Sequence, residues 1–223
     1  MSKQRSIALV TGMPAKWIKL KAGLTLLRIS PSLKSLFLLL RQRRRLHGNK
    51  KDHKIVRSGN RYYWSIYTPG FPSEGFNSMI QQEIRRAFQP EPETKALQTL
   101  ILSISSRCDY QCEHCYEGNN LGSLEKLSIA SLEKVLQEAI DLNIPHIQIG
   151  GGEPMLRFHD LISLLELGKG HMEFWLSTSG YGLTRDKAHD LKAAGLSGAT
   201  ISLDHWEAEN HNRFRHHPEA FKW

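Results

Sequence analysis

Cysteine is scarce in this 223-residue sequence, and long apolar runs are missing altogether. The longest apolar run, Leu36 to Leu40, is far too short to span a bilayer. The first residues are polar, and no small-residue cleavage site follows an apolar core, so we expect no cleavable signal peptide. These absences favour a cytoplasmic protein over a secreted or membrane-spanning one.

Acidic residues are nearly absent from residues 1–55, which hold 14 Lys and Arg against the single acid Asp52. The formal net charge of +8 therefore belongs to this segment, because residues 56–223 hold 16 basic and 21 acidic residues. Basicity confined to one segment gives no reason to expect a nucleic-acid partner. Apolar clusters on either side of Pro31 indicate two helices. Two interpretations stay open: a peripheral membrane contact through residues 16–46, or a solvated basic face over a small helical cap.

Strand and helix patterns divide the remaining chain. Residues 47–60 are polar and suggest a linker, and aromatic residues at 62–67 followed by an apolar pattern at 76–88 predict a strand and a helix. From residue 97 strands alternate with helices, which predicts βαβ units and a parallel sheet. The strands are expected at 97–105, 146–149, 173–177 and 198–204, with helices at 128–142, 160–167 and 184–194. The predicted organisation is a basic segment (1–55), an aromatic lead-in (56–96) and an α/β core (97–223).

All three cysteines lie within eight residues, with the spacing C-x3-C-x2-C: Cys108, Cys112 and Cys115. An odd, clustered set makes a poor disulfide framework and fits thiolates kept reduced for a metal. Thiolates suit iron–sulfur clusters and zinc. With no fourth cysteine, a [4Fe–4S] cluster held here would leave one iron open to another ligand. A second interpretation is zinc with His114 as the fourth ligand, but its tetrahedral geometry would be strained because His114 is adjacent to Cys115. A third interpretation is that the cysteines bind no metal.

Four motifs in order resemble the radical S-adenosylmethionine (SAM) superfamily over residues 97–217. The first is the cysteine spacing after the first strand of the core, and the second is Gly151-Gly152-Glu153-Pro154 after the second strand. Ser177-Thr178-Ser179-Gly180 resembles the family's T-N-G-type segment with serine in place of asparagine. Ile201-Ser202-Leu203-Asp204 followed by residues 211–215 resembles its S-L-D…H-x-x-x-R stretch. The resemblance implies a partial (β/α) barrel of the TIM type.

The resemblance also implies a [4Fe–4S] cluster, SAM and an external electron donor such as a flavodoxin- or ferredoxin-like protein. Glu153 would hold the SAM amino group, and Gly151 and Gly152 would let the backbone approach SAM closely. Ser179 and Ser202 would contact the nucleoside or the carboxylate, while Arg213 would pair with the carboxylate or remain a surface arginine. No side chain receives a catalytic role, because the cofactor carries the chemistry.

The chain departs from the family pattern in one respect, because we expect about four strands where the family has six. We therefore expect a chain truncated at its C-terminal end. The implied function is formation of a 5′-deoxyadenosyl radical that abstracts hydrogen from an unidentified peptide or small molecule. The alternative is a non-catalytic iron–sulfur electron carrier or a degenerate SAM-binding fragment. The Gly-Gly-Glu-Pro segment discriminates between them, because an electron carrier needs no site for the amine of SAM.

Overall fold

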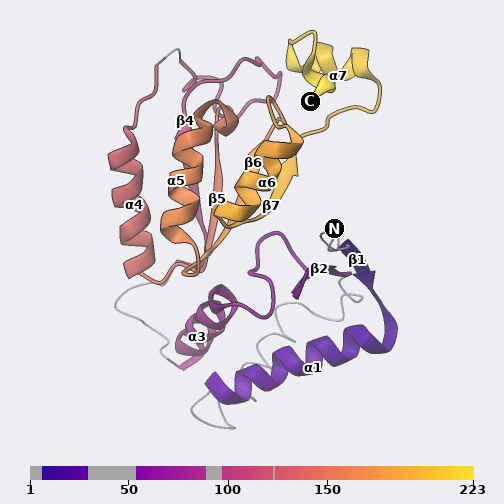
Figure 1. Cartoon of the computed structure of the whole chain (residues 1–223), viewed down its shortest axis with the longest axis vertical. Coiled ribbons are helices and arrows are strands. Elements are labelled where there is room, and N and C mark those ends of the chain that lie inside the picture. Colours follow the sequence, from indigo (N-terminus) through magenta and orange to yellow (C-terminus); the bar gives the residue numbers. More distant parts are fainter. Residues whose placement is uncertain (1–6, 30–53, 89–96, 123) are drawn as a thin grey trace. The chain divides into compact units, whose positions relative to one another are not determined.

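The computed structural model of this chain describes residues 7–29, 54–88, 97–122 and 124–223 (Figure 1). The chain divides into two compact units, Met1–Gln98 with Asn143–His146, and Thr99–Leu142 with Ile147–Trp223. Each unit is described by itself. Among the described residues, no helix combines the length and the apolar character needed to cross a bilayer.

Where the first unit is described, it consists of an antiparallel sheet and two helices. Strands β1 (Ile7–Val10), β2 (Ile55–Ser58) and β3 (Arg61–Tyr63) lie in that order in the sheet. Helices α1 (Gly12–Ile29) and α3 (Glu74–Phe88) contribute a small apolar core. This core consists of Ala22, Phe76, Met79, Ile80 and Ile84, with Trp64 and Phe71 packed against it.

Two predictions for the first unit need correction. Residues 55–58 are strand β2 and not part of a linker, because the β-branched pair Ile55 and Val56 can join a ladder and Ile55 is fully buried. Gly59, with φ of 63°, begins the turn to β3. The strand predicted at 62–67 ends at Tyr63. The second basic helix, beyond Pro31, lies outside the described residues.

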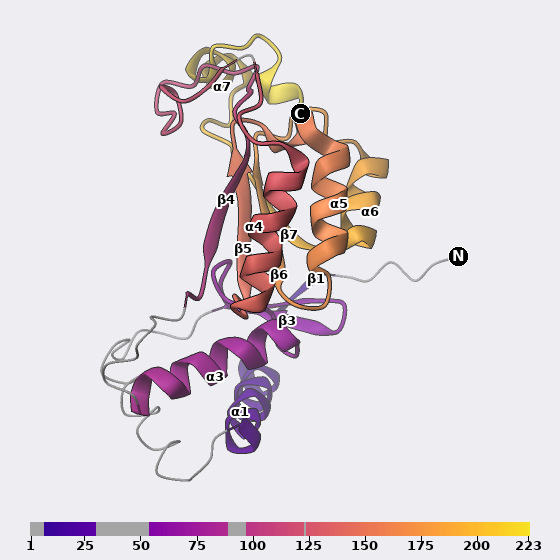
Figure 2. The ribbon, with the colours of Figure 1, turned by 90° about the vertical axis from the view of Figure 1, so that its left-hand side faces the viewer.

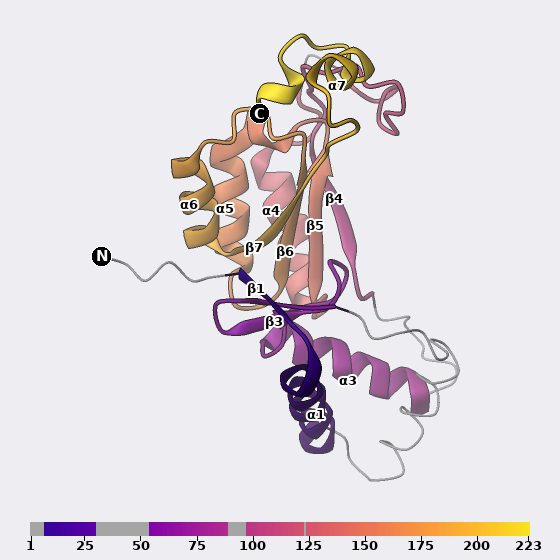
Figure 3. The ribbon, with the colours of Figure 1, turned by 90° about the vertical axis from the view of Figure 1, so that its right-hand side faces the viewer.

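The second unit is built on a four-stranded sheet whose strand order follows the sequence. Its strands are β4 (Leu100–Ser105), β5 (His146–Gly151), β6 (Glu173–Thr178) and β7 (Leu196–Ile201). The pairs β4–β5 and β6–β7 are parallel. Helices α4 (Ile129–Asp141), α5 (Phe158–Gly168) and α6 (Arg185–Ala194) all cover one face of this sheet (Figures 2 and 3). This arrangement confirms the predicted α/β class with a parallel sheet.

Local sequence signals set the helix boundaries of this unit. Ser128 caps α4 by accepting a hydrogen bond from the Ser131 amide, and Thr184 caps α6 by accepting one from the Lys187 amide. Gly195 ends α6 with a φ of 124°, which only glycine adopts without strain. The covered face of the sheet supplies the core, because alternate strand residues point to it. Its fully buried residues include Ile147, Ile149, Phe174 and Leu176.

The opposite face of the sheet is polar near its centre. Ser103 of β4 is in register with Gly150 of β5, and Gln148 Nε2 donates a hydrogen bond of 2.8 Å to Ser177 Oγ of β6. The strand predicted at 198–204 is shifted, because β7 pairs with β6 only from Leu196 to Ile201. Ser202 and Asp204 therefore belong to the segment that follows the strand, which leads to helix α7 (Ala208–Arg215).

Candidate functional site

The cysteine loop follows β4 and lies at the same end of the sheet as α7 (Figures 2 and 3). Cys108, Cys112 and Cys115 are free thiols, and each is partly buried. Cys112 and Cys115 lie at the two ends of a backbone turn, since the Cys115 amide donates to the Cys112 carbonyl at 3.1 Å. The loops that leave parallel strands meet at one edge of the sheet, so the predicted motifs are placed beside each other.

The Gly-Gly-Glu-Pro segment is joined to the start of the cysteine loop by two backbone hydrogen bonds. The Gly152 amide donates to the Ser105 carbonyl and the Glu153 amide donates to the Arg107 carbonyl, both at 2.7 Å. A Cβ at Gly152 would overlap the Arg107 carbonyl oxygen. The glycine is required because two backbone segments approach each other here. Gly152 thus makes a close backbone approach to residue 107, directly before Cys108, and the expected approach of Gly151 and Gly152 to SAM stays a prediction.

Glu153 is almost fully buried, at 2% exposure, and its carboxylate accepts four hydrogen bonds. Oε1 accepts from the Met155 amide at 2.9 Å and from Thr178 Oγ1 at 2.6 Å. Oε2 accepts from the Ser179 amide at 2.8 Å and from Ser179 Oγ at 2.5 Å. About four lone-pair positions are available on a carboxylate, so these donors satisfy it completely. The structure brings the predicted residues Glu153 and Ser179 into direct contact and adds Thr178, which the sequence analysis did not single out.

The remaining predicted residues lie on the segment after β7. The Ser202 amide, directly after the last residue of β7, donates to the Thr178 carbonyl at 3.0 Å. Arg213 is exposed, and its guanidinium donates to Asn210 Oδ1 at 2.6 Å. Asp204 accepts a hydrogen bond from Arg215 at 2.7 Å. The roles of Ser202 and Arg213 toward SAM stay predictions, and the buried arginine of this region is Arg215.

The contacts of His114 bear on which metal the cysteines could hold. Within the described ranges, no three His, Cys, Asp or Glu side chains converge as the ligands of one ion must. His114 points elsewhere, since its Nε2 lies 3.8 Å from Asp204 Oδ1 and its ring packs on Phe214. A [4Fe–4S] cluster bonds each thiolate to a different iron, so its ligands stand apart from one another. These contacts count against zinc with His114 as the fourth ligand.

Burial controls the ionisation of the first cysteine. Desolvation raises the pKa of Cys108 from its ordinary value of 9.0 to about 11, while a hydrogen bond from the Tyr110 backbone lowers it. The negative charge of Glu153 adds to the rise. Without a metal, the Cys108 thiol is therefore protonated at neutral pH, and metal binding must displace this proton.

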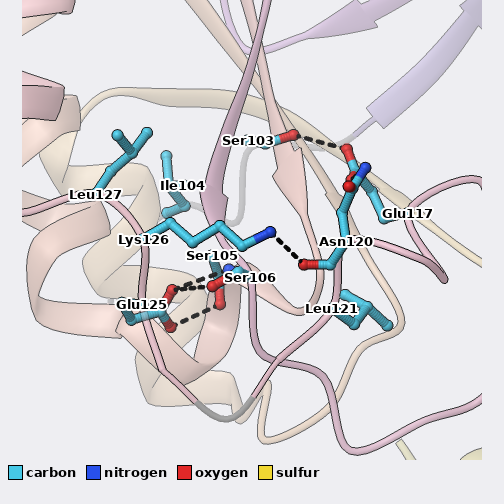
Figure 4. Close-up of a pocket in the computed structure, with 10 residues that line it drawn as sticks. All are labelled: Ser103, Ile104, Ser105, Ser106, Glu117, Asn120, Leu121, Glu125, Lys126 and Leu127. Carbon is cyan, nitrogen blue, oxygen red and sulfur yellow. Dashed lines mark hydrogen bonds between the residues drawn. The ribbon is translucent and has the colours of Figure 1, made fainter.

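A cavity of about 340 Å³ lies beside the edge strand β4, between it and the segment after the cysteines (Figure 4). It is lined by residues 103–106, 117, 120, 121 and 125–127, so it contains none of the predicted ligands. Its polar groups are already paired: Glu125 accepts from Ser105 Oγ and from the Ser106 amide, both at 2.9 Å. These bonds tie the returning segment to β4, and the cavity does not mark the cluster site.

Comparison with known proteins identifies the family. The model of the Radical SAM superfamily matches residues 102–222, which is more than half of the chain. The chain belongs to the radical SAM superfamily. The enzymes of this family use a [4Fe–4S] cluster and SAM, so both cofactor predictions are confirmed at the level of the family.

Several relatives of this radical SAM chain are GTP 3′,8-cyclases. The Helicobacter pylori enzyme is 32% identical over 115 residues, which cover 49% of this chain and 36% of that protein. The Campylobacter jejuni enzyme is 36% identical over 111 residues, which cover 47% of this chain and 34% of that protein. A structure of Streptococcus suis SuiB bound to S-adenosylmethionine matches 65% of this chain and 35% of that one, with 18% identity and a TM-score of 0.48. The chain thus spans about a third of the length of these relatives.

We expect Gly152→Ala to destabilise the second unit by about 2 kcal/mol, since its Cβ overlaps a backbone oxygen that cannot move without breaking the Glu153–Arg107 bond. Urea unfolding followed by circular dichroism measures the change. Gly122→Ala is the matched control, because a Cβ there meets nothing within 4 Å. Equal midpoints for the two variants would contradict the packing described here.

We expect Cys108 of the iron-free, folded chain to react with iodoacetamide at pH 9 at least about tenfold more slowly than in the urea-unfolded chain. The reactive species is the thiolate, and the raised pKa lowers its fraction at this pH. Peptide mass spectrometry measures both rates. The folded-state rate should keep rising up to about pH 11, whereas the unfolded-state rate levels off near its pKa of 9.0. A folded-state rate that levels off near pH 9 would show that the thiol is not desolvated.

Proposed function

We propose that this chain binds a [4Fe–4S] cluster through Cys108, Cys112 and Cys115 and cleaves SAM reductively. The observation that carries the proposal is the bonding of the Gly-Gly-Glu-Pro segment to residues 105 and 107, which places Glu153 next to the cysteine loop. When bound, the cluster supplies an electron that breaks a sulfonium bond of SAM and yields a 5′-deoxyadenosyl radical. The radical would serve to abstract hydrogen from a peptide or a small-molecule substrate, and a flavodoxin- or ferredoxin-like protein would supply the electron.

Glu153 and Ser179 form the part of the site that would receive the amino group of SAM. The Glu153 carboxylate is buried and fully hydrogen-bonded, so an incoming ammonium group must replace one of its donors. The Ser179 hydroxyl is the donor that can rotate away, because the Ser179 and Met155 amides are fixed in the backbone and Thr178 is buried. The ammonium would then form a charge-assisted hydrogen bond in place of a neutral one.

The test is anaerobic reconstitution with iron and sulfide, followed by dithionite and SAM. We expect release of 5′-deoxyadenosine, measured by liquid chromatography, and its loss in Cys112→Ala. In Glu153→Gln we expect the cluster to form, while the SAM concentration that perturbs its EPR signal rises by about tenfold or more, because the carboxylate charge is gone. A reducible cluster whose EPR signal ignores SAM in the parent chain would instead support the electron-carrier alternative.

The exposed face of helix α1 supports a second candidate activity, which is contact with an anionic membrane surface. Its exposed apolar residues recur at helical spacing along one face: Met13, Trp17, Leu20 and Leu24. The opposite face holds the buried residues Ile18 and Ala22. The exposed Lys16 and Lys21 flank the apolar stripe, and residues 1–55 carry the basic excess of the chain. Apolar side chains flanked by lysines suit the boundary between acyl chains and anionic headgroups.

We expect the chain to sediment with vesicles of phosphatidylcholine and phosphatidylglycerol but not with phosphatidylcholine alone. The double variant Trp17→Ser, Leu24→Ser should bind about tenfold more weakly, because two of the apolar contacts are lost. Leu142→Ser is the control, since Leu142 is an exposed apolar residue of the other unit. Equal sedimentation of the double variant and the parent would contradict this use of α1.

A further inference from the structure

Helix α7 ends against the cysteine loop, and the two share backbone hydrogen bonds. The Gln111 amide donates to the Arg215 carbonyl at 3.1 Å, and the Glu113 amide donates to the Phe214 carbonyl at 3.2 Å. The last carbonyls of a helix have no partner within the helix and must find one elsewhere. The loop that carries the cysteines supplies these partners, although it precedes α7 by about a hundred residues in the sequence.

Arg215 reinforces this contact with its side chain, which is only 6% exposed. Its Nε donates to Asp204 Oδ2 at 2.7 Å, and its guanidinium lies 6.0 Å from the ring centre of Tyr110, a residue of the cysteine loop at 2% exposure. A buried guanidinium without a partner would be costly, so Asp204 fixes its position. Arg215 is thereby held between the segment after β7 and the cysteine loop.

His211 completes the arrangement on the same face of α7, four residues before Arg215. It is 2% exposed, and its Nδ1 accepts a hydrogen bond from the Asp204 amide at 3.2 Å. Burial lowers the pKa of His211 and the positive charge of Arg215 lowers it further, while the negative charge of Asp204 raises it. As the acceptor of the Asp204 amide, Nδ1 carries no proton. Asp204 is therefore held through its backbone by His211 and through its carboxylate by Arg215.

The charge of Arg215 lies beside the cysteine loop. Its guanidinium is 6.0 Å from the ring centre of Tyr110, and its carbonyl accepts a hydrogen bond from the amide of Gln111, the residue before Cys112. A cluster on three thiolates gains a negative charge when it is reduced, so a fixed cation nearby stabilises the reduced state more than the oxidised one. Arg213 is placed differently, because its guanidinium is exposed and donates to Asn210 Oδ1.

We propose that Arg215 is a positioning residue for the iron–sulfur cluster: it clamps the cysteine loop to α7 through Asp204 and Tyr110, and its charge raises the reduction potential of the cluster. The inference rests on the cluster assignment of the proposed function. It concerns a residue that the sequence analysis passed over, because Arg213 was chosen within the same His-Asn-Arg-Phe-Arg stretch.

The test compares Arg215→Gln and Arg215→Lys with Arg213→Gln, a matched control two residues away on the same helix. After anaerobic reconstitution, iron and sulfide content and the midpoint potential from an EPR-monitored redox titration are measured. Arg215→Gln should hold at most about half of the parent's iron, and the cluster that forms should be harder to reduce. Arg215→Lys should keep a midpoint potential close to that of the parent but bind less iron. Lysine keeps the positive charge but lacks the planar guanidinium group that arginine uses for hydrogen bonding. Arg213→Gln should match the parent in both quantities.

Hydrogen exchange of the iron-free chains gives a readout that needs no cluster. The Gln111 and Glu113 amides should exchange several-fold faster in Arg215→Gln than in Arg213→Gln, with α4 and α5 protected equally in both. Parent-like exchange, iron content and potential in Arg215→Gln would overturn the proposal, and a loss of iron at unchanged potential would overturn the role of the charge. If the parent chain takes up no iron and sulfide, the cluster assignment itself is refuted. The Arg215 proposal is judged separately, from the difference between each variant and its parent.

Discussion

One buried carboxylate ties together the loops at the carboxyl end of the sheet. Glu153 follows β5, and its four donors come from its own turn, from the last residue of β6 and from the residue after it. A carboxylate at 2% exposure is tolerated only when its lone pairs are filled, so the positions of Thr178 and Ser179 depend on it as much as it depends on them. Through the bond between its amide and the Arg107 carbonyl, the same residue holds the entry to the cysteine loop. Three segments far apart in the sequence thereby acquire one fixed geometry.

Much of the sheet unit could be predicted because its signals are local. Ser128, Thr184 and Gly195 mark helix ends by side-chain or backbone chemistry that acts within a few residues, and the structure places the ends of α4 and α6 there. Strand β2 was missed because its two apolar residues follow a polar stretch, and only pairing with β1 and β3 makes it a strand. The C-terminal limit of β7 was misplaced for a similar reason. The run through Leu203 reads as apolar and β-rich, but pairing with β6 ends at Ile201.

The candidate site shows the same division between local and distant information. The cysteine spacing and the Gly-Gly-Glu-Pro segment were visible as motifs, and the family match confirms the superfamily they indicated. The sequence could not show that the close approach at Gly152 is made to Arg107, because that requires knowing which strands are neighbours. Arg213 was chosen in the sequence, although the H-x-x-x-R spacing counted from His211 ends at Arg215. The four-residue spacing from His211 to Arg215, which puts both side chains on one face of α7, is the signal that separates them.

The bonds between α7 and the cysteine loop also bear on the order of events during synthesis. Residues 108–115 leave the ribosome well before residues 204–215, so the three thiols are present before the segment that accepts the Gln111 and Glu113 amides and before the cation that faces Tyr110. A loop closed by partners so distant in sequence gains its shape late, since the intervening strands must pair first. In the nascent chain the cysteine loop therefore lacks the hydrogen bonds and the cation that α7 supplies until residues 204–215 have been made.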